Sequence, residues 1–208
     1  LSRAPLLEVM DTVSLDVHST MEFPQTSMYT DGKYYFFPFP KTQKSGSKWY
    51  LHFLHELKYF VYEEIGEEIV LEKTVDLGVE AAVLPRAEDF EVAMKYSMTN
   101  QRPVSILQRY RFESKTIVFY KKGVHEEVLK QGQTEVDLEL MDQTYAAVFD
   151  ANNNLIQKGI EISAGLIFSR AITEDGEILV KKNQDYFGTE EDHVIYYKLK
   201  FFDENEKN

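Results

Sequence analysis

Residues 144–202 read TYAAVFDANNNLIQKGIEISAGLIFSRAITEDGEILVKKNQDYFGTEEDHVIYYKLKFF, and this stretch decides the fold class. Short apolar runs alternate in it with turn-forming segments; the runs are 145–149, 155–162, 166–168, 178–180 and 194–202. The turn residues are 152–154 (Asn-Asn-Asn), Asp175-Gly176 and Gly188. Asn and Asp tolerate the left-handed backbone of tight hairpin turns, and Gly adopts it at no steric cost. Runs of this length fit strands better than helices, so the stretch predicts an antiparallel meander.

The composition indicates a folded chain with a large aromatic core. Hydrophobic residues make up 43% and aromatic residues 13% of the 208 residues, whereas disorder requires low hydrophobicity together with high charge. The supply of Tyr and Phe suits strands, whose surfaces are pleated and half-buried. We expect a single all-β domain over residues 1–208, with a charged tail at 203–208 that frays.

The charge and the residue types that are missing exclude several classes of function. A formal net charge of −12 disfavours nucleic acid and anionic membranes as partners, because phosphate binding needs an excess of Lys and Arg. The absence of Cys excludes disulfides, thiolate metal sites and a Cys nucleophile. A glycine-rich phosphate loop, a GxSxG elbow and an HExxH motif are also missing. We therefore expect no cofactor and no metal, and the sequence indicates no particular oligomeric state.

The compartment is not evident from the residues themselves. No apolar run reaches the length of a transmembrane helix, so we expect no transmembrane segment. The chain begins at Leu1 rather than Met, and we expect a trimmed or mature form from which any signal peptide has been removed.

The N-terminal part predicts a strand, a hairpin and a loop. Partial alternation over residues 6–17 favours a strand. Residues 27–37 favour a hairpin around an Asp31-Gly32 turn. Residues 41–48, KTQKSGSK, are expected to form a mobile polar loop.

The middle of the chain predicts more strands, with one place where a helix competes. Strands are expected at 49–62, 65–77, 106–112, 116–120, 124–130 and 136–140. Residues 87–98 contain helix formers at rough helical spacing, and Pro85 prevents a helix there from extending backwards.

Three segments share a strand–turn–strand pattern. They are KYFVYEEIGEEIVLEK (58–73), KTIVFYKKGVHEEVLKQ (115–131) and TYAAVFDANNNLIQKGI (144–160). Such recurrence is typical of β-propeller blades, although any antiparallel protein rich in hairpins produces similar echoes.

Patches at both ends resemble the bacterial six-bladed β-propeller lipoproteins. The first blade of that family is similar to DTVSLD (11–16), SMYTDGKYYFFPF (27–39) and VLEKTVDLG (70–78). Its outer hairpin and last blade are similar to VFDANNNLIQKGIEI (148–162) and to residues 168–202. The resemblance implies an exported, lipid-anchored protein of the bacterial periplasm or cell surface, and it brings no catalytic residue.

The length departs from that family, because six blades of four strands need well over 208 residues. The expected strands fill about three blades, so a smaller sandwich-like or closed β-fold is the alternative. Pairing of 6–17 with 194–202 in one sheet would close a ring, whereas separate sheets would indicate a sandwich or an open arrangement.

Polar candidates for chemistry are scattered. His52 and His55 lie three residues apart in a predicted strand, so they point to opposite faces and do not share a metal ion without distortion. Paired carboxylates suited to acid–base chemistry occur at 63–64, 67–68, 126–127 and 190–192. Residues 150–154 and 185–192 are rich in oxygen ligands, but neither has the spacing of an EF-hand loop.

The densest aromatic patch lies in residues 34–50. Alternation places Tyr34 and Phe36 on the face opposite Tyr35, so one set can be core while the other is exposed. Exposed aromatic side chains stack on sugars or anchor protein partners. We therefore take Tyr34, Phe36, Trp49 and Tyr50 as the candidate ligand-binding residues.

The sequence thus favours a non-enzymatic binding or interaction module of the bacterial cell envelope, with a protein or glycan ligand. One alternative is a carbohydrate-active enzyme, which requires two carboxylates facing each other at roughly 5–10 Å across a cleft. Another is a structural protein of a phage or secretion assembly.

Overall fold

The structure is a computed structural model that describes residues 5–35, 38–86, 88–92, 102–129 and 132–201. The prediction of an all-β chain of antiparallel strands is confirmed. The chain divides into two compact units, Leu1–Ile106 with Lys122–Leu129 and Leu107–Lys121 with Lys130–Asn208. The single domain expected from the sequence stays a prediction. Among the described residues, no helix combines the length and the apolar character needed to cross a membrane.

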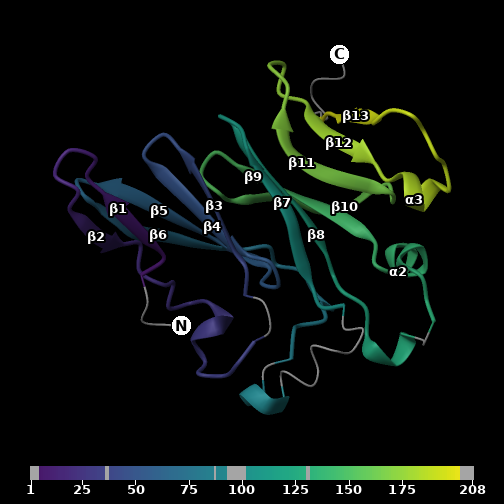
Figure 1. Ribbon diagram of the computed structural model, residues 1–208, viewed down its shortest axis with the longest axis horizontal. Coiled ribbons are helices and arrows are strands. Elements are labelled where there is room, and N and C mark those ends of the chain that lie inside the picture. Colours follow the sequence, from purple (N-terminus) through teal and green to yellow (C-terminus); the bar gives the residue numbers. More distant parts are fainter. Residues whose placement is uncertain (1–4, 36–37, 87, 93–101, 130–131, 202–208) are drawn as a thin grey trace. The chain divides into compact units, whose positions relative to one another are not determined.

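The first unit is built on a four-stranded meander. Its strands are β3 (Pro40–Ser45), β4 (Lys48–Phe53), β5 (Lys58–Ile65) and β6 (Glu68–Asp76), paired antiparallel in chain order (Figure 1). Alternation along β4 and β5 turns large side chains to one face, where they form a core with residues that precede the sheet. The buried members are Met21, Phe23, Tyr29, Tyr35, Leu51, Phe53, Phe60, Tyr62 and Ile69. This meander and the preceding segment therefore share one hydrophobic core.

A short hairpin precedes that sheet. Strands β1 (Leu7–Met10) and β2 (Val17–Thr20) pair antiparallel and form a sheet of their own. The turn between them is held by Asp11, whose Oδ1 accepts hydrogen bonds from the N–H groups of Val13 and Ser14 at 2.7 and 2.9 Å. The single strand expected over 6–17 is therefore wrong, because an Asx turn reverses the chain inside it.

The second unit contains two packed sheets. One has the order β10–β9–β8–β7, with β7 (Ser105–Arg111), β8 (Lys115–Lys121), β9 (Thr144–Asp150) and β10 (Leu155–Ile162) (Figure 1). The other has the order β11–β12–β13; its strands are β11 (Leu166–Ile172), β12 (Ile178–Lys182) and β13 (Tyr196–Leu199). Their shared core includes Tyr110, Ile117, Phe119, Ala146, Val148, Ile178 and Val180.

Two expected strands are helical. Residues 136–140 belong to α2 (Glu135–Met141), because Thr134 and Asp137 form a reciprocal capping box at its N-terminus. The capping box favours a helix over a strand at this point. Of the described apolar residues at alternate positions of α2, Leu138 alone is buried. Residues 124–130 hold the short 3-10 helix η2 (Glu126–Val128) in place of a strand. A last helical turn, α3 (Gln184–Phe187), ends at the left-handed Gly188.

Three further local predictions need correction. Residues 41–48 are not a loop, because residues 41–45 belong to the edge strand β3, whose side chains are mostly exposed and are therefore free to be polar. The expected hairpin over 27–37 is wrong, since 28–30 form the 3-10 helix η1 (Met28–Thr30). The expected strand 49–62 is broken by a turn at 54–57 into β4 and β5. Within the expected helix 87–98, residues 90–92 are helical, and 87 and 93–98 lie outside the described residues.

The recurring segments and the chain ends bear on the propeller resemblance. Segments 58–73 and 144–160 are the hairpins β5–β6 and β9–β10, and each supplies the last two strands of a four-stranded meander. Segment 115–131 continues from β8 into η2 and is not a hairpin. Strand β1 pairs with β2 and β13 pairs with β12, so 6–17 and 194–202 lie in separate sheets. The described ends of the chain therefore do not pair to close a ring, which favours a sandwich or open arrangement, although the meander order by itself also occurs in propeller blades.

Candidate functional site

An open groove of about 760 Å³ runs between the segment after β2 and the outer strand β6. Ligand sites in proteins occupy roughly 300–1,000 Å³, so this groove, here called the β6 groove, has the size of a binding site. Its buried lining residues are Thr20, Met21, Phe23 and Ile69. Its exposed lining residues are Pro5, Ser19, Glu22, Gln25, Thr26, Glu68, Val70 and Leu71.

Hydrogen bonds at two points fix the segment 20–26 alongside β6. At one end, the Ile69 N–H donates to Thr20 Oγ1 at 2.8 Å. At the other end, the hydroxyls of Thr26 and Thr74 are 2.7 Å apart and share a hydrogen bond. The groove opens between these two points, and the core side chains beneath it keep both borders in place.

The border formed by β6 is the free edge of a sheet. Strand β6 is the last in the order β3–β4–β5–β6, and its Ile69 N–H faces away from β5 because it reaches Thr20. Its register with β5 is unbroken from Ile69 to Leu71. In an antiparallel strand, alternate residues turn their main-chain groups to the same side, so Leu71 also directs its N–H and C=O into the groove. The site thus combines main-chain donors and acceptors with apolar side chains.

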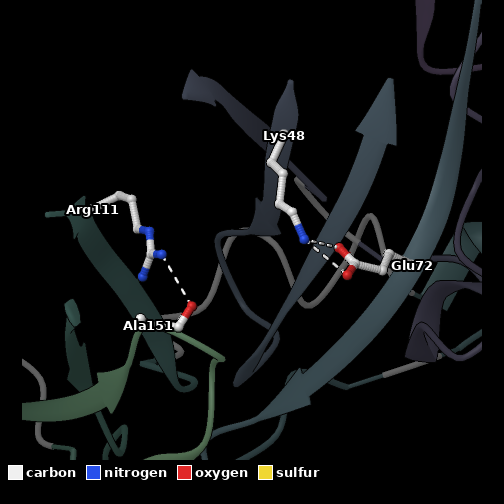
Figure 2. Close-up of polar contacts among 4 residues, drawn as sticks. All are labelled: Lys48, Glu72, Arg111 and Ala151. Atoms are coloured by element: carbon white, nitrogen blue, oxygen red, sulfur yellow. Dashed lines mark hydrogen bonds and ion pairs between the residues drawn. The ribbon is translucent and has the colours of Figure 1, made fainter. Parts of the chain in front are cut away.

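The charge of the groove comes from two carboxylates. Glu22 and Glu68 line it, and no Lys or Arg occurs among its described lining residues. The neighbouring Glu72 does not add to this charge, because Lys48 Nζ lies 2.8 and 2.6 Å from its two carboxylate oxygens (Figure 2). That hydrogen bond raises the pKa of Lys48 above its ordinary value. The β6 groove is therefore acidic.

A buried carboxylate supports the chain just after the segment 20–26 that borders the groove. Glu56 is 2% exposed, and it accepts hydrogen bonds from Ser27 Oγ at 2.7 Å and from the Met28 N–H at 2.9 Å. These bonds hold η1 against the turn between β4 and β5. Burial raises the pKa of Glu56 above its ordinary value, and the bonds from Ser27 and Met28 oppose that rise.

The raised pKa of Glu56 predicts a pH-dependent stability. A carboxyl group whose folded pKa exceeds its unfolded pKa contributes stability at low pH, and this contribution is lost as pH rises through the folded pKa. Glu56→Gln has no such titration and still offers an oxygen to the Met28 N–H. We therefore expect the unmodified protein to lose stability relative to Glu56→Gln as the pH rises from 4 to 7. Urea titrations at each pH measure the difference between the two free energies of unfolding.

Glu67→Gln is the matched control, because Glu67 is an exposed glutamate in the same unit. Its stability should follow that of the unmodified protein at every pH. A constant difference between Glu56→Gln and the unmodified protein would contradict the assignment of a raised pKa to Glu56.

The three aromatic candidates that the structure describes do not form one cluster around a cavity. Tyr34 is half-buried with its ring 4.9 Å from that of Phe90, and Phe36 lies outside the described residues. Trp49 is half-buried under the ammonium of Lys44, which lies 5.3 Å from its ring centre, and it packs on the core of the first unit. Tyr50 is 2% exposed and, as the next residue of β4, points to the other face of the sheet. Binding by these residues stays a prediction.

Three of the glutamate-rich turns hold a carboxylate in an ion pair. Glu64 pairs with Lys44 at 2.5 Å, Glu126 with Arg86 at 2.6 Å and Glu191 with Lys182 at 2.6 Å. The hydrogen bond from Lys44 lowers the pKa of Glu64. A general acid needs the opposite shift, so this carboxylate suits a surface ion pair better than glycoside cleavage.

The other polar candidates stabilise local structure. His55 Nδ1 donates to the Val104 C=O at 2.8 Å, and His52 is buried on β4. The Asp150 carboxylate accepts hydrogen bonds from the N–H groups of Asn152 and Asn154, which closes the β9–β10 turn. No group of three or more potential metal ligands occurs among the residues that the structure describes.

The β9–β10 turn is also bound to β7. Arg111 donates from Nη2 to the Ala151 C=O at 3.1 Å (Figure 2). Its Nη1 donates to Thr116 Oγ1 at 3.1 Å. The Asn-rich loop between β9 and β10 is therefore a structural turn that is hydrogen-bonded to β7.

Sequence reasoning missed the β6 groove. The partners of Thr20 and Thr26 on β6 lie 49 and 48 positions away, beyond the reach of any local pattern. The strand predicted at 65–77 contains the β6 border of the groove, but a strand pattern does not tell an edge strand from a central one.

Comparisons with known proteins support the fold. No family model and no curated protein matches the chain. The fold is similar to the crystal structure of a member of the DUF4221 family from Bacteroides vulgatus, with a TM-score of 0.64 and 9% sequence identity. The similarity covers 95% of this chain and 54% of that protein, so the chain spans about half of its length. At this identity the likeness shows a shared all-β fold alone.

Proposed function

We propose that the chain is a non-enzymatic binding module of the bacterial cell envelope that holds a protein or glycan ligand in the β6 groove. The observation that carries the proposal is the groove itself. It has about 760 Å³, a packed floor and borders fastened at Thr20 and Thr26. A preformed site of this kind binds without the entropic cost of ordering its walls.

Two further observations support a binding role over catalysis. Three of the carboxylates that the sequence offers for acid–base chemistry, those of Glu64, Glu126 and Glu191, are in ion pairs at 2.5–2.6 Å. Among the described lining residues, the titratable side chains are those of Glu22 and Glu68, and both are exposed to solvent, whereas catalytic carboxylates are usually enclosed in a cleft with a charged or buried partner.

The envelope location rests on resemblance. The patches at 11–16, 27–39 and 148–162 resemble lipid-anchored bacterial β-propeller proteins, and the similar solved structure is bacterial. Fractionation of the producing bacterium should recover the chain with the envelope; recovery in the cytosol would contradict this part of the proposal.

A matched pair of variants tests the binding role. Leu71→Glu places a charge in the groove, and Leu155→Glu places the same charge on β10, an outer strand of the other four-stranded sheet. Both leucines are exposed, at 36% and 42%, so both variants should fold. We expect ligands found in NMR titrations with synthetic peptides and neutral oligosaccharides to shift the amides of 19–26 and 68–71.

For such a ligand, Leu71→Glu should weaken binding at least about tenfold, because a charge then opposes apolar contact. Leu155→Glu should leave it unchanged. Chemical-shift changes confined to Tyr34 and Trp49, or equal losses of affinity in both variants, would contradict binding in the β6 groove. Cleavage of any oligosaccharide in the panel would replace the proposal with an enzyme.

A further inference from the structure

We infer that the ligand of the β6 groove is an extended polypeptide segment that pairs with β6 as an added strand and carries cationic residues beside its apolar ones. This inference rests on the proposed function and names the class of its ligand.

The backbone of β6 supports strand addition. On the outer edge of β6, the main-chain groups of Leu71 point into the groove. The Ile69 N–H points the same way, because it donates to Thr20, and Leu71 lies two residues further along the same regular strand. The regular part of this edge is Ile69–Leu71, since a bulge follows between Leu71 and Lys73, and beyond it Thr74 is bound to Thr26. An extended peptide laid there gains main-chain hydrogen bonds that do not depend on its sequence.

The side chains favour a peptide over a sugar. Val70 and Leu71 are exposed at 48% and 36%, although both are aliphatic and border the groove. Phe23 is the aromatic residue among the described lining residues, and it is only 6% exposed, so its ring offers little surface for stacking on a sugar. Aliphatic walls fit the alternate side chains of a strand, whereas sugars are bound by exposed rings.

Charge selects among peptides. Glu22 and Glu68 line the groove, whereas Lys58, whose ammonium donates to the Thr26 C=O at 3.2 Å, is not among its described lining residues. A Lys or Arg on the ligand therefore finds a complementary surface at the two carboxylates. A second copy of this chain is a poor occupant, because each copy has a formal net charge of −12 and repels another. The occupant is therefore a basic segment of a different protein.

The probes are synthetic seven-residue peptides with blocked ends that alternate Val and Thr and carry either Lys or Glu at both ends. The Lys-ended peptide should bind more tightly than the Glu-ended one, by about tenfold at low salt, and shift the amides of Ile69 and Leu71. The double variant Glu22→Lys/Glu68→Lys should invert this preference, and the distant Glu126→Lys/Glu127→Lys should retain it.

N-methylation of the peptide backbone tests strand pairing directly. Alternate residues of a paired strand donate to β6, so methyl groups on one parity should weaken binding about tenfold and methyl groups on the other should have little effect. If methylation at odd and at even positions weakens binding equally, strand addition is overturned, because docking through side chains does not distinguish the two sets of positions.

The outcomes separate the two proposals. If no peptide binds while an oligosaccharide shifts residues 68–71 and loses affinity in Leu71→Glu, the polypeptide ligand is wrong and the binding groove stands. If the peptide binds elsewhere, with the amides of 19–26 and 68–71 unmoved, both are wrong. Tighter binding of the Glu-ended peptide would overturn the cationic ligand alone.

Discussion

Phe119→Ala is expected to lower the free energy of unfolding by about 3–5 kcal/mol, the usual cost of emptying a buried aromatic site. Phe119 is fully buried on β8, where its ring lies 4.3 Å from that of Phe168 and 5.7 Å from that of Tyr110. It also approaches Phe201 at 5.8 Å, so it connects the two sheets of the second unit. Urea unfolding followed by circular dichroism measures the loss.

Two variants give this measurement its scale. Phe119→Leu keeps most of the buried volume and should cost less than half as much as alanine. Phe39→Ala removes a ring that is 50% exposed and should cost less than about 1 kcal/mol. A loss below about 1 kcal/mol for Phe119→Ala would show that the two sheets do not depend on this ring for their packing.

Gly123→Ala is expected to cost about 2–4 kcal/mol, through backbone strain together with a steric clash. Gly123 has φ +81°, which disfavours every residue with a side chain. A Cβ there would lie 2.5 Å from the Arg102 carbonyl oxygen and 2.8 Å from the Val104 nitrogen. These are backbone atoms of the bridge between Arg102 and Val124, and they have little freedom to move aside.

Gly32→Ala is the matched control for Gly123→Ala. Gly32 has φ +83°, but a Cβ there would meet no atom within 4 Å. This substitution therefore carries the strain without the clash and should cost about 1 kcal/mol in urea unfolding. Equal losses at the two positions would mean that the chain at Arg102 moves away from the new methyl group.

Local signals in the sequence were sufficient for two hairpins, one in each unit of the fold. The hairpins β5–β6 and β9–β10 were visible in 58–73 and 144–160, because apolar strands flank short turns there. The side chains of such turns, including Asp150, satisfy their own backbone and need no distant partner.

The errors lie where a local pattern had two solutions. Residues 136–140 alternate as a strand does, yet Thr134 and Asp137 cap a helix. Residues 41–45 are polar, as a loop is, yet an edge strand with one hydrogen-bonded neighbour tolerates the same residues. The aromatic run at 34–50 predicted a patch, yet Trp49 and Tyr50 leave β4 on opposite faces.

Periodicity, turn chemistry and composition are enough to predict the all-β class, two of the hairpins and the acidic character of the protein. The β6 groove and the burial of Glu56 arise from packing between distant segments. The groove depends on contacts such as Thr20 to Ile69 and Thr26 to Thr74, and Glu56 reaches Ser27. Partners that lie 29 to 49 positions apart meet only when the core beneath them packs, and no pattern within one segment records that encounter.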